Sequence, residues 1–579
     1  MKGKKYMRIT YEEKIFEASE PVKVNEILKE DITEKHIACV VNNQVHALDY
    51  EIREDAKVEL LDINSKDGRN VYIRGVMFIM GKAFSECYPK ALLTVNYQLH
   101  NSMFCQIDNM KVSDEMIDNV REKMKEIIKA DLPITKTVMS VEEAKAFYTH
   151  SKSANGRFQI NNHAKEVSLY FCGDYFNYLY GTMPLSTGMM KIFEIQKYKD
   201  GYLVRYPDKT DMTKLGEYKE TKKLLSTFDE YDDIYKLLNV NTVYKLNKKV
   251  EDGEINDFIL LSEALHEKKI SILADKISKK SDVKMILIAG PSSSGKTTFA
   301  RKLSLGLRLK GIKPVTISVD NYFVERKDNP RDEYGNYDFE CIEAIDLELF
   351  NDHLVRLLNG ETVEVPRFDF KVGTKVYDGT TMSLKKDEIL VIEGIHCLND
   401  RLTKAIPKEE KVKIYISDLT VLNIDYFNRI STTDTRLIRR IVRDYKYRGY
   451  DALSTLQTWY SVNRGEEKYI YPYQEEADYM FNSSLIYELA AEKKYAVPLL
   501  KQIDSTHKEY GEAQRLIQFL EYFEDIPDDD IPNTSLLREF IGGSIYHKEN
   551  LYVKIVDLMY LNLDILVEII VLNVYIRNT

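Results

Sequence analysis

Short apolar runs alternate with helical stretches from residue 284 onward, and this alternation is the clearest pattern in the chain. The runs are KMILIAG, KPVTISVD, EILVIEG and KVKIYIS, and each is followed by a stretch with helical spacing of apolar residues. Strands that helices cover on both faces carry continuous apolar runs of this kind. We therefore expect an α/β fold with a doubly wound parallel sheet over residues 281–500.

The chain before this region follows a different pattern, in which helix and strand signals are mixed. Residues 6–62 read as short strands around one short helix, and helical spacing recurs near 71–87 and 113–130. A charged, helix-rich stretch then leads into the apolar runs. These patterns predict an α+β domain over 1–62, a second domain over 63–225 and a helical connector over 226–280.

The last part of the chain, residues 501–579, is predicted to be a C-terminal helical segment. Its end, 548–579, contains neither glycine nor proline. Charged residues there form one polar stripe of a helix, namely Lys554, Asp557, Asp564 and Glu568. A helix or strand pair packed on the body is our first interpretation, and a helix at a membrane surface or against a partner is the second.

Composition narrows the range of partners. The 579 residues are 44% hydrophobic and 30% charged with a net charge of −10, which does not favour a broad surface for RNA. Six cysteines occur without a C-x-x-C pair, which is typical of reduced thiols and not of a zinc site or a disulfide framework. No apolar leader and no long uncharged apolar window is present. We expect a cytoplasmic protein without a membrane partner.

A phosphate-binding motif follows the first apolar run. Residues 290–298 read GPSSSGKTT, the pattern G-x-x-x-x-G-K-[ST] between a predicted strand and a predicted helix. In such a loop backbone amides approach the phosphates, a lysine neutralises their oxygens and a threonine hydroxyl binds Mg²⁺. A turn without a ligand is the alternative, which the complete motif disfavours. The predicted site for ATP and Mg²⁺ comprises Gly290, Ser292, Ser293, Ser294, Gly295, Lys296, Thr297 and Thr298.

Two acidic residues end predicted strands of the same sheet. Asp320 ends KPVTISVD and Glu393 ends EILVIEG, at the edge where open parallel sheets bind ligands. One carboxylate can help to hold Mg²⁺, and the other can accept the proton of an acceptor hydroxyl. A single acid at a strand end is more often a cap or turn residue, but two of them after a phosphate loop favour catalysis.

An arginine-rich stretch, RLIRRIVRDYKYRG, follows the fourth apolar run. Arg436, Arg440 and Arg443 share one helix face, where like charges destabilise the helix unless anions neutralise them. We interpret this helix as a lid that closes over polyphosphate. The alternative is a solvent-exposed basic face that pairs with Asp434 and Asp444.

The motifs of residues 284–485 together resemble the uridine kinase family, with phosphoribulokinase as the nearest cousin. The shared segments, in order, are GPSSSGKTT, SVDNYF, GNYDFE, VPRFDF, VIEGIHCLND, RLIRRIVRDYKYRG and EEADYMFNSS. The resemblance implies a P-loop kinase in which Asp320 is the base that activates the acceptor hydroxyl and Glu393 supports the metal ion. The other implied roles are catalysis by Lys296, Arg440 and Arg443, nucleotide binding by Arg448, metal binding by Thr297 and Asp320, and substrate binding by Asp338, Phe368 and Arg440.

The segments that are expected to contact the acceptor depart from the family pattern at four positions. Family groups that can hydrogen-bond a uracil or its sugar are a Tyr, a His, an Arg and a Gln. Here these positions are Phe368, Gly373, Tyr450 and Thr458. The residues expected to bind the phosphates match the family pattern, whereas these four groups do not. We therefore expect uridine to be a poor acceptor.

The N-terminal half resembles the front of threonyl-tRNA synthetase, with a TGS-like domain over 1–62 and an editing-like domain over 63–225. The segments that carry this likeness are YIRGVMFIMGKAFSECYP and YFCGDYFNYLYGTMPLSTGMMKIFEI. Residues that cannot bind a metal or transfer a proton replace the hydrolytic site of that family. They are Gly75, Ile79, Leu179 and Met183. The resemblance implies a scaffold without hydrolytic chemistry.

Taken together, the sequence predicts a Mg·ATP-dependent kinase that phosphorylates a hydroxyl of a small molecule, with a nucleoside or another sugar-bearing compound as the leading acceptor. A phosphoribulokinase-like sugar-phosphate kinase is the close alternative. An alternative from another class is a regulatory NTPase whose N-terminal domains bind RNA or an amino-acid-related ligand. RNA is the less favoured partner, and a homo-oligomer is left open.

Overall fold

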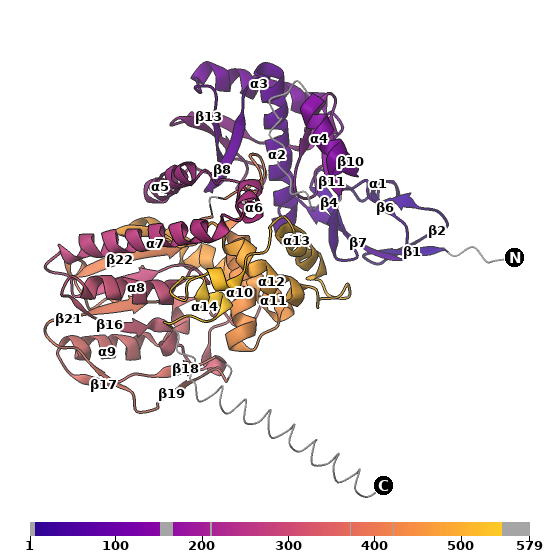
Figure 1. Ribbon diagram of the computed structural model, residues 1–579. Coiled ribbons are helices and arrows are strands. Elements are labelled where there is room, and N and C mark those ends of the chain that lie inside the picture. The colour runs from indigo at the N-terminus through magenta and orange to yellow at the C-terminus, as the bar shows by residue number, and fades with distance from the viewer. Residues whose placement is uncertain (1–5, 151–165, 209–210, 371, 421, 547–579) are drawn as a thin grey trace, which may run out of the picture.

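The computed structural model combines an α/β body at the C-terminal side with a mixed α and β region at the N-terminal side (Figure 1). It describes residues 6–150, 166–208, 211–370, 372–420 and 422–546. The predicted packing of the tail at 548–579 lies outside these residues. Within the described residues, no helix combines the length and the apolar character that a membrane span needs.

The C-terminal body is built on a parallel sheet with the strand order β16-β21-β15-β22-β23. Its strands are β15 (Met285–Ala289), β16 (Lys313–Ser318), β21 (Glu388–Glu393), β22 (Lys411–Ser417) and β23 (Tyr479–Asn482). The four apolar runs of the sequence form β15, β16, β21 and β22. The prediction of a parallel sheet in this region is therefore confirmed.

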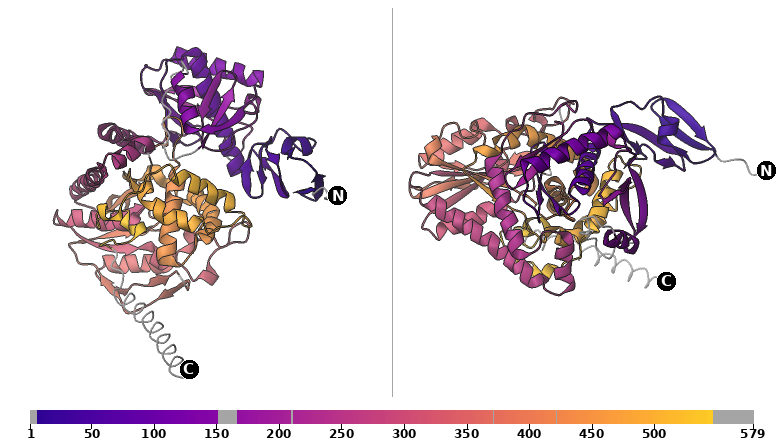
Figure 2. Two further views of the ribbon diagram at one scale, coloured as in Figure 1. Left: turned by 45° about the vertical axis from the view of Figure 1, so that its right-hand side comes forward. Right: turned by 90° about the horizontal axis from the view of Figure 1, so that it is seen from above.

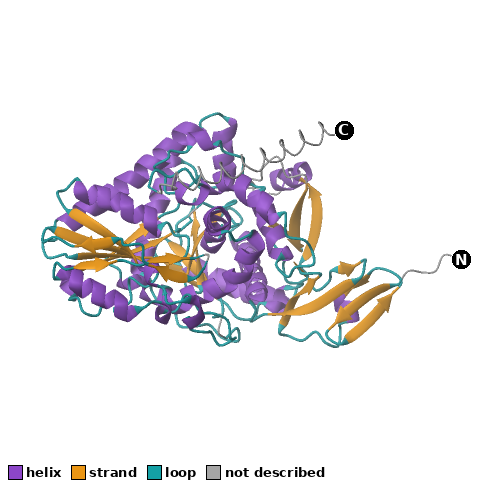
Figure 3. Ribbon diagram, turned by 90° about the horizontal axis from the view of Figure 1, so that it is seen from below, coloured by secondary structure: helices purple, strands orange, loops and turns teal. Residues whose placement is uncertain are grey.

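Helices cover both faces of this sheet, as Figure 3 shows. Successive side chains of a strand point to opposite faces. Ile286 of β15 packs in one apolar cluster with Phe299, whereas Leu287 packs in another with Phe350. The two aromatic residues belong to α8 (Lys296–Arg308) and α9 (Leu347–Leu358). Burial on both faces explains the unbroken apolar run and defines a doubly wound sheet.

Further helices follow β22 in the sequence and pack on one another. They are α10 (Thr432–Arg443), α11 (Ala452–Tyr469), α12 (Glu488–Leu500), α13 (Tyr510–Leu520) and α14 (Arg538–Ile541). Two short hairpins lie between α9 and β21, formed by β17 (Thr362–Glu364) with β20 (Thr381–Ser383) and by β18 (Arg367–Asp369) with β19 (Thr374–Val376). The second hairpin carries Phe368 in β18 and Gly373 in its turn, immediately before β19.

The helical stretch between the two halves packs directly on the C-terminal body. It comprises α5 (Lys222–Leu238), α6 (Val243–Glu251) and α7 (Ile255–Ser278). Ile259, Ile270 and Leu273 of α7 are buried in the same apolar cluster as Ile286 of the sheet. The connector is therefore part of the core and not a free linker.

The N-terminal region contains a small sheet followed by a long helix and two further sheets. The small sheet has the order β2-β1-β7-β4-β5 and projects from the edge of the molecule in both views of Figure 2. Its elements are β1 (Met7–Tyr11), β2 (Lys14–Ala18), α1 (Val24–Ile27), β4 (His36–Val41), β5 (Gln44–His46) and β7 (Ala56–Asp62), and β3 (Val22–Lys23) pairs with β6 (Glu51–Ile52). The pattern of strands around one short helix matches the sequence expectation.

The rest of this region packs around the helices α2 (Lys66–Cys87) and α3 (Asp114–Ala130), close to the predicted 71–87 and 113–130. One sheet has the order β13-β14-β9-β8, and another has the order β10-β11-β12. Their elements are β8 (Leu93–Leu99), β9 (Ser102–Ile107), β10 (Thr135–Ser140), α4 (Val141–His150), β11 (Glu166–Cys172), β12 (Tyr175–Tyr178), β13 (Glu194–Tyr198) and β14 (Gly201–Arg205).

Candidate active site

The phosphate-binding motif forms the tight turn between β15 and α8. A side chain at Gly290 has no room, because its Cβ would lie 1.9 Å from the carbonyl oxygen of Ile416. Gly295 has a φ of +82°, which favours glycine, and the helix begins at the next residue. Lys296 bends back over the loop, where its Nζ donates to the carbonyl oxygens of Gly290 at 3.0 Å and Pro291 at 3.1 Å. The loop amides and this ammonium group form a concave cationic site for phosphate.

The predicted carboxylates lie at the same edge of the sheet as this loop. Glu393 is the last residue of β21 and pairs in register with Ile288 of β15, and it is 6% exposed. The Oγ1 of Thr297 donates to its Oε1 at 3.5 Å. Asp320 follows β16 in the short turn Val319–Tyr322. The structure therefore brings together a hydroxyl and two acids from three separate stretches of sequence.

The electrostatics of Glu393 show how close these groups are. Burial first, and then the negative charge of Asp320, raise the pKa of the Glu393 carboxyl to about 7, while Lys296 opposes both effects. A divalent cation at this position would offset the cost of a buried negative charge on Glu393. Hydroxyl and carboxylate oxygens are also the donors that Mg²⁺ prefers, together with waters and substrate phosphates.

Within the described residues, no group of three or more His, Cys, Asp or Glu side chains is arranged to hold a metal ion. Mg²⁺ that binds together with a nucleotide takes most of its ligands from phosphate and water and only one or two from the protein. The hydroxyl of Thr297 and the carboxylate of Glu393 are oxygen donors of this kind. The residues present therefore fit the group that the motif implies.

Two arginines of α10 are structural, which corrects the prediction that Arg436 faces polyphosphate. Arg436 and Glu466 are each 1% exposed at the side chain and form an ion pair. Arg436 also donates to the carbonyl oxygen of Ser292 at 3.1 Å. Arg439 is fully buried against Glu488 and donates to the carbonyl oxygen of Ser293 at 3.3 Å. These two guanidinium groups support the phosphate loop through the carbonyl oxygens of Ser292 and Ser293.

The remaining lid arginines converge on one acid. Arg443 lies 2.8 Å from Oδ1 of Asp444, Arg440 lies 3.2 Å from its Oδ2, and Arg448 lies 3.6 Å from its Oδ1. Burial would raise the pKa of Asp444, but the three guanidinium groups outweigh burial and lower it. Arg440 also reaches the phosphate loop, where its Nη1 donates to Oγ of Ser292 at 2.8 Å. The three cations thus lie beside the loop with a single carboxylate between them.

The alternative for the arginine helix was a solvent-exposed basic face that pairs with Asp434 and Asp444. Only Asp444 forms such pairs. Asp434 does not pair with the arginines of its own helix, because Arg515 of α13 binds it through two contacts of 2.8 and 2.9 Å. Asp444 does pair with them, but it is 3% exposed and belongs to the interior. The arginine helix is therefore buried in part rather than solvated along one face.

Of the predicted substrate residues, Phe368 lies beside the turn that carries Asp320, because its amide donates to Oδ1 of Asn321 at 3.3 Å. Asp338 accepts from the amide of Glu340 and from the hydroxyl of Tyr469, each at 3.1 Å. Phe368 is 9% exposed and contacts the rings of Phe323 and Phe370, with centroid distances of 5.5 and 5.2 Å. Asp338 is thus held in place by its neighbours, and Phe368 belongs to a group of three aromatic rings.

Gly373 leaves room for a neighbouring arginine. Its φ is +82°, and a Cβ there would lie 2.6 Å from Nε of Arg326. Arg326 donates to the carbonyl oxygen of Phe370 at 2.7 Å, and Arg448 lies over the Phe370 ring at 4.8 Å. A guanidinium group therefore takes the space beside the position where the family has a histidine.

The other two changed positions do not place a polar group in the acceptor site. Tyr450 is 41% exposed. The hydroxyl of Thr458 turns back to its own helix and donates to the carbonyl oxygens of Ser454 at 3.2 Å and Thr455 at 3.1 Å. The departures read from the sequence thus correspond to a different local arrangement and not to a simple exchange of side chains.

The sequence patterns did not single out Glu340, which lies between the loop and the lid. Its Oε2 is buried and has no hydrogen-bond partner within the described part of the chain. Burial first, and then the charge of Glu466, raise its pKa to about 7, while Arg440 and Lys296 oppose this shift. The only signal for this residue was its place at the end of the GNYDFE motif, because nothing in the local periodicity marks it.

The N-terminal positions that replace a hydrolytic site are buried in apolar surroundings. Ile79, Leu179 and Met183 belong to one hydrophobic cluster with exposures of 0%, 4% and 2%. A Cβ at Gly75 would lie 2.7 Å from the sulfur of Met190. These residues form packed core and line no polar site.

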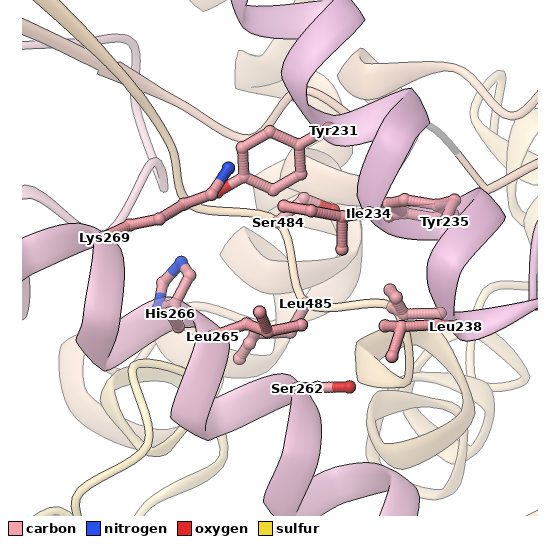
Figure 4. Close-up of a pocket in the computed structure, with 11 residues that line it drawn as sticks. Tyr231, Ile234, Tyr235, Leu238, Ser262, Leu265, His266, Lys269, Ser484 and Leu485 are labelled. Atoms are coloured by element: carbon pink, nitrogen blue, oxygen red, sulfur yellow. The ribbon is translucent and has the colours of Figure 1, made fainter.

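A second pocket lies away from the phosphate loop, between α5, α7 and the chain after β23 (Figure 4). Lys269 lies over the ring of Tyr231 at 3.4 Å, and burial lowers its pKa to about 8. The hydroxyl of Tyr231 donates to the carbonyl oxygen of Asn482 at 2.7 Å, and Nε2 of His266 lies 3.2 Å from the same oxygen. These contacts attach the connector helices to the edge of the sheet.

Comparison with known proteins agrees with this site. Residues 285–488 match the model of the Phosphoribulokinase / Uridine kinase family. The uridine kinase of Bacillus pumilus (strain SAFR-032) is 30% identical over 197 residues, which are 34% of this chain and 83% of that protein. The uridine kinase of Halobacterium salinarum is 29% identical over 192 residues, which are 33% of this chain and 76% of that protein. This chain therefore belongs to the phosphoribulokinase/uridine kinase family.

Among solved structures, that of a possible uridine kinase from Bacillus stearothermophilus is 23% identical and covers 37% of this chain and 98% of its own, with a TM-score of 0.24. Family membership makes the chain a P-loop kinase with a small-molecule substrate. The sequence relatives match the C-terminal body, and the N-terminal region lies outside those matches.

Proposed function

We propose that the protein transfers the γ-phosphoryl group of Mg·ATP to a hydroxyl of a small molecule, with a nucleoside as the leading acceptor. The observation that carries this proposal is the meeting of Lys296, Thr297 and Glu393 at one sheet edge, with Asp320 facing them. Lys296, Thr297 and Glu393 serve the phosphates and the metal ion. Asp320 is then the group that faces the acceptor.

The transfer step follows from these positions. The acceptor oxygen forms a bond to the γ-phosphorus while the bond from that phosphorus to the bridging oxygen of ADP breaks. The hydroxyl proton passes to the carboxylate of Asp320. Lys296, Arg440 and Arg443 stabilise the charge on the transferring group. Thr297, Glu393 and Asp320 are the residues of this chain that would hold Mg²⁺, which would supply positive charge to the phosphates.

The nucleotide is held by the loop amides from Gly290 to Thr298, and Arg448 is proposed to contact it when the lid closes. The arginines beside the loop already have one acid, Asp444, as a counter-ion. A polyphosphate carries more negative charge than one carboxylate, so it draws these side chains toward the loop. Lid closure is therefore an exchange of one anion for another.

The acceptor site favours a ligand that offers hydroxyl groups. Asp338 is fixed by Tyr469 and by the amide of Glu340, so it presents an oriented carboxylate to hydrogen-bond donors. The aromatic group of Phe368, Phe323 and Phe370 suits an apolar or aromatic ring face. A ribose joined to a base other than uracil meets both requirements, which supports a nucleoside as the substrate.

One observation supports the sugar-phosphate alternative. Arg326 and Arg448 both lie against Phe370, at the rim of the acceptor site. Two guanidinium groups at such a rim could bind a phosphate that the acceptor already carries. The proposal therefore includes a panel of sugar phosphates in its test.

We further propose that the N-terminal region, residues 1–62 and 63–225, is a TGS-like and synthetase-editing-like scaffold without hydrolytic chemistry. The apolar burial of Ile79, Leu179 and Met183 supports the loss of that chemistry. A ligand of this region that regulates the kinase is the second candidate function. The contact of Asp434 on α10 with Arg515 on α13, whose neighbour Gly511 packs on Asn43, gives such a ligand a route to the lid helix.

The experiment is an ADP-formation screen with the purified full-length protein, ATP and Mg²⁺, which assumes the cytoplasmic conditions that we propose. The panel contains purine and pyrimidine nucleosides, pentose phosphates and RNA. Acceptor-dependent ADP with a nucleoside supports the leading proposal, and ADP only with a sugar phosphate selects the alternative. Stimulation by RNA alone replaces both with the regulatory NTPase.

A further inference from the structure

A carboxylate from the far C-terminal part of the chain lies on the phosphate loop. The segment 531–546, which contains α14, runs along the start of α8 (Figure 1). Oε2 of Glu539 accepts a hydrogen bond from the backbone amide of Thr298 at 3.0 Å. Leu536 of the same segment is fully buried and packs directly on Gly295, where a Cβ would lie 2.6 Å from its Cδ2.

The amide that Glu539 binds belongs to the phosphate cradle. In a loop of this pattern, the backbone amides at the start of the helix hold the α- and β-phosphates of the nucleotide. Thr298 is the third residue of α8, and the amides of the first helical turn point out of the helix start. A carboxylate oxygen in hydrogen-bond contact with this amide stands where a phosphate oxygen would stand.

The charge of Glu539 also reaches the metal-side acid. The pKa of Glu393 is raised first by burial, then by Asp320, and Glu539 adds to the same effect. A polyphosphate in the cradle would therefore meet a third carboxylate at close range. Because like charges at such a distance repel each other, Glu539 and a bound nucleotide cannot share the amide.

The same segment is tied to the lid. The ring of Phe540 lies 5.0 Å from the guanidinium carbon of Arg439, and Nζ of Lys446 donates to the carbonyl oxygen of Ile541. A Cβ at Gly542 would lie 2.8 Å from Nζ of Lys446. Displacement of this segment would therefore disturb both the cradle and the turn that carries the lid arginines.

We propose that Glu539 is a residue of the nucleotide site that holds the cradle amide in the empty enzyme and yields it to the phosphate of an incoming nucleotide. Segment 531–546 then moves away from the start of α8 when nucleotide binds. Glu539 thereby sets the affinity for nucleotide. This inference rests on the proposed function, because it requires that the loop binds a nucleoside triphosphate. If Glu539 served only to stabilise the start of α8, removal of its charge would leave the affinity for nucleotide unchanged, which separates the two roles.

The test measures the Kd of ATP by titration calorimetry for the full-length wild type, Glu539→Gln and Asp529→Asn. Glutamine keeps the size of the side chain and an oxygen that can accept from Thr298, but it removes the charge. Asp529 is exposed in the same part of the chain, so Asp529→Asn is a matched loss of one negative charge. We expect Glu539→Gln to bind ATP about tenfold more tightly than the wild type, and Asp529→Asn to stay within about twofold.

A second readout is hydrogen exchange in the wild type. ATP should increase amide exchange in peptides from 531–546 while it slows exchange in the loop 290–298. Equal Kd values for the wild type and Glu539→Gln, or slower exchange in 531–546, would overturn the inference and leave the proposed function intact. Failure of all three proteins to bind ATP would overturn the proposed function and this inference together.

Discussion

Arg436 and Glu466 form a two-pronged ion pair inside the protein, with Nη1 to Oε1 at 2.5 Å and Nη2 to Oε2 at 2.7 Å. The same Oε1 accepts from the backbone amide of Ser292 at 2.9 Å. The pair therefore links α10 and α11 to the phosphate loop. Its position explains why a cation of the arginine helix is directed inward rather than toward a ligand.

Breaking this pair should be costly. Arg436→Met leaves the carboxylate of Glu466 buried without a counter-charge, so we expect a loss of about 3–5 kcal/mol in the free energy of unfolding. The double variant Arg436→Met/Glu466→Leu should regain much of that loss, because no uncompensated charge remains. Urea denaturation of the three proteins checks this. A single variant within 1 kcal/mol of the wild type would show that the pair does not hold the loop.

The lid arginines should affect the chemical step more than nucleotide binding. With the acceptor identified by the screen, Arg443→Ala should lower kcat by about 10²- to 10³-fold, because its charge is needed on the transferring group. The KM for ATP should change much less. Arg308→Ala, at the exposed end of α8, is the matched control. A large rise in the KM for ATP with unchanged kcat would reassign Arg443 to ground-state binding.

The arginine helix also shows where sequence reasoning reaches its limit. The strands could be predicted because burial on both faces leaves an unbroken apolar run, as in β15, and the loop because its residues are contiguous. The roles of Arg436 and Arg439 could not be predicted, because their partners Glu466 and Glu488 are 30 and 49 residues away in the sequence. Helical spacing alone makes buried and exposed arginines look the same.

The same limit applies to the residues that complete the site. Glu539 comes to the loop from 241 positions further along the chain. Arg326 takes the space beside Gly373 only because of how the β18–β19 hairpin folds back. Helix α3 was predictable, in contrast, because a local amphipathic pattern specifies it, whereas α2 is buried on all sides over 75–84.

Acid pH should destabilise the contact between the connector and the sheet. His266 is 3% exposed, and burial lowers its pKa to about 3, with the charge of Lys302 acting in the same direction. The unfolded state takes up a proton near pH 6.5 but the folded state does not, so stability is present above pH 6.5 and is lost as pH falls below it. Between pH 7 and pH 5, the protonation of His266 in the unfolded state should lower the free energy of unfolding by about 2 kcal/mol.

The measurement is the free energy of unfolding of the wild type and of His266→Gln at several pH values. The variant should be less stable at pH 7 but should lose about 2 kcal/mol less between pH 7 and 5. Equal pH dependence of the two proteins would show that His266 is not held neutral by its surroundings.

Uridine should be a poor acceptor. A pocket loses about 1–3 kcal/mol for each buried polar group that stays unpaired, and Phe368 and Gly373 remove two partners. We expect kcat/KM for uridine to lie about 10³-fold or more below that for the true acceptor. Gly373→His alone should not restore it, because Arg326 takes the space that the imidazole needs. Uridine as the best acceptor in the panel would disprove this interpretation of the pocket.

The central claim is that this kinase uses Asp320 to activate an acceptor hydroxyl beside a Mg·ATP site. The most direct measurement compares ATP binding and acceptor-dependent ADP formation in the wild type, Asp320→Asn and Lys296→Ala. We predict that Asp320→Asn binds ATP like the wild type but loses about 10²- to 10⁴-fold in kcat, whereas Lys296→Ala loses transfer through lost charge compensation of the phosphoryl group. Turnover of Asp320→Asn close to that of the wild type on the same acceptor would contradict the account.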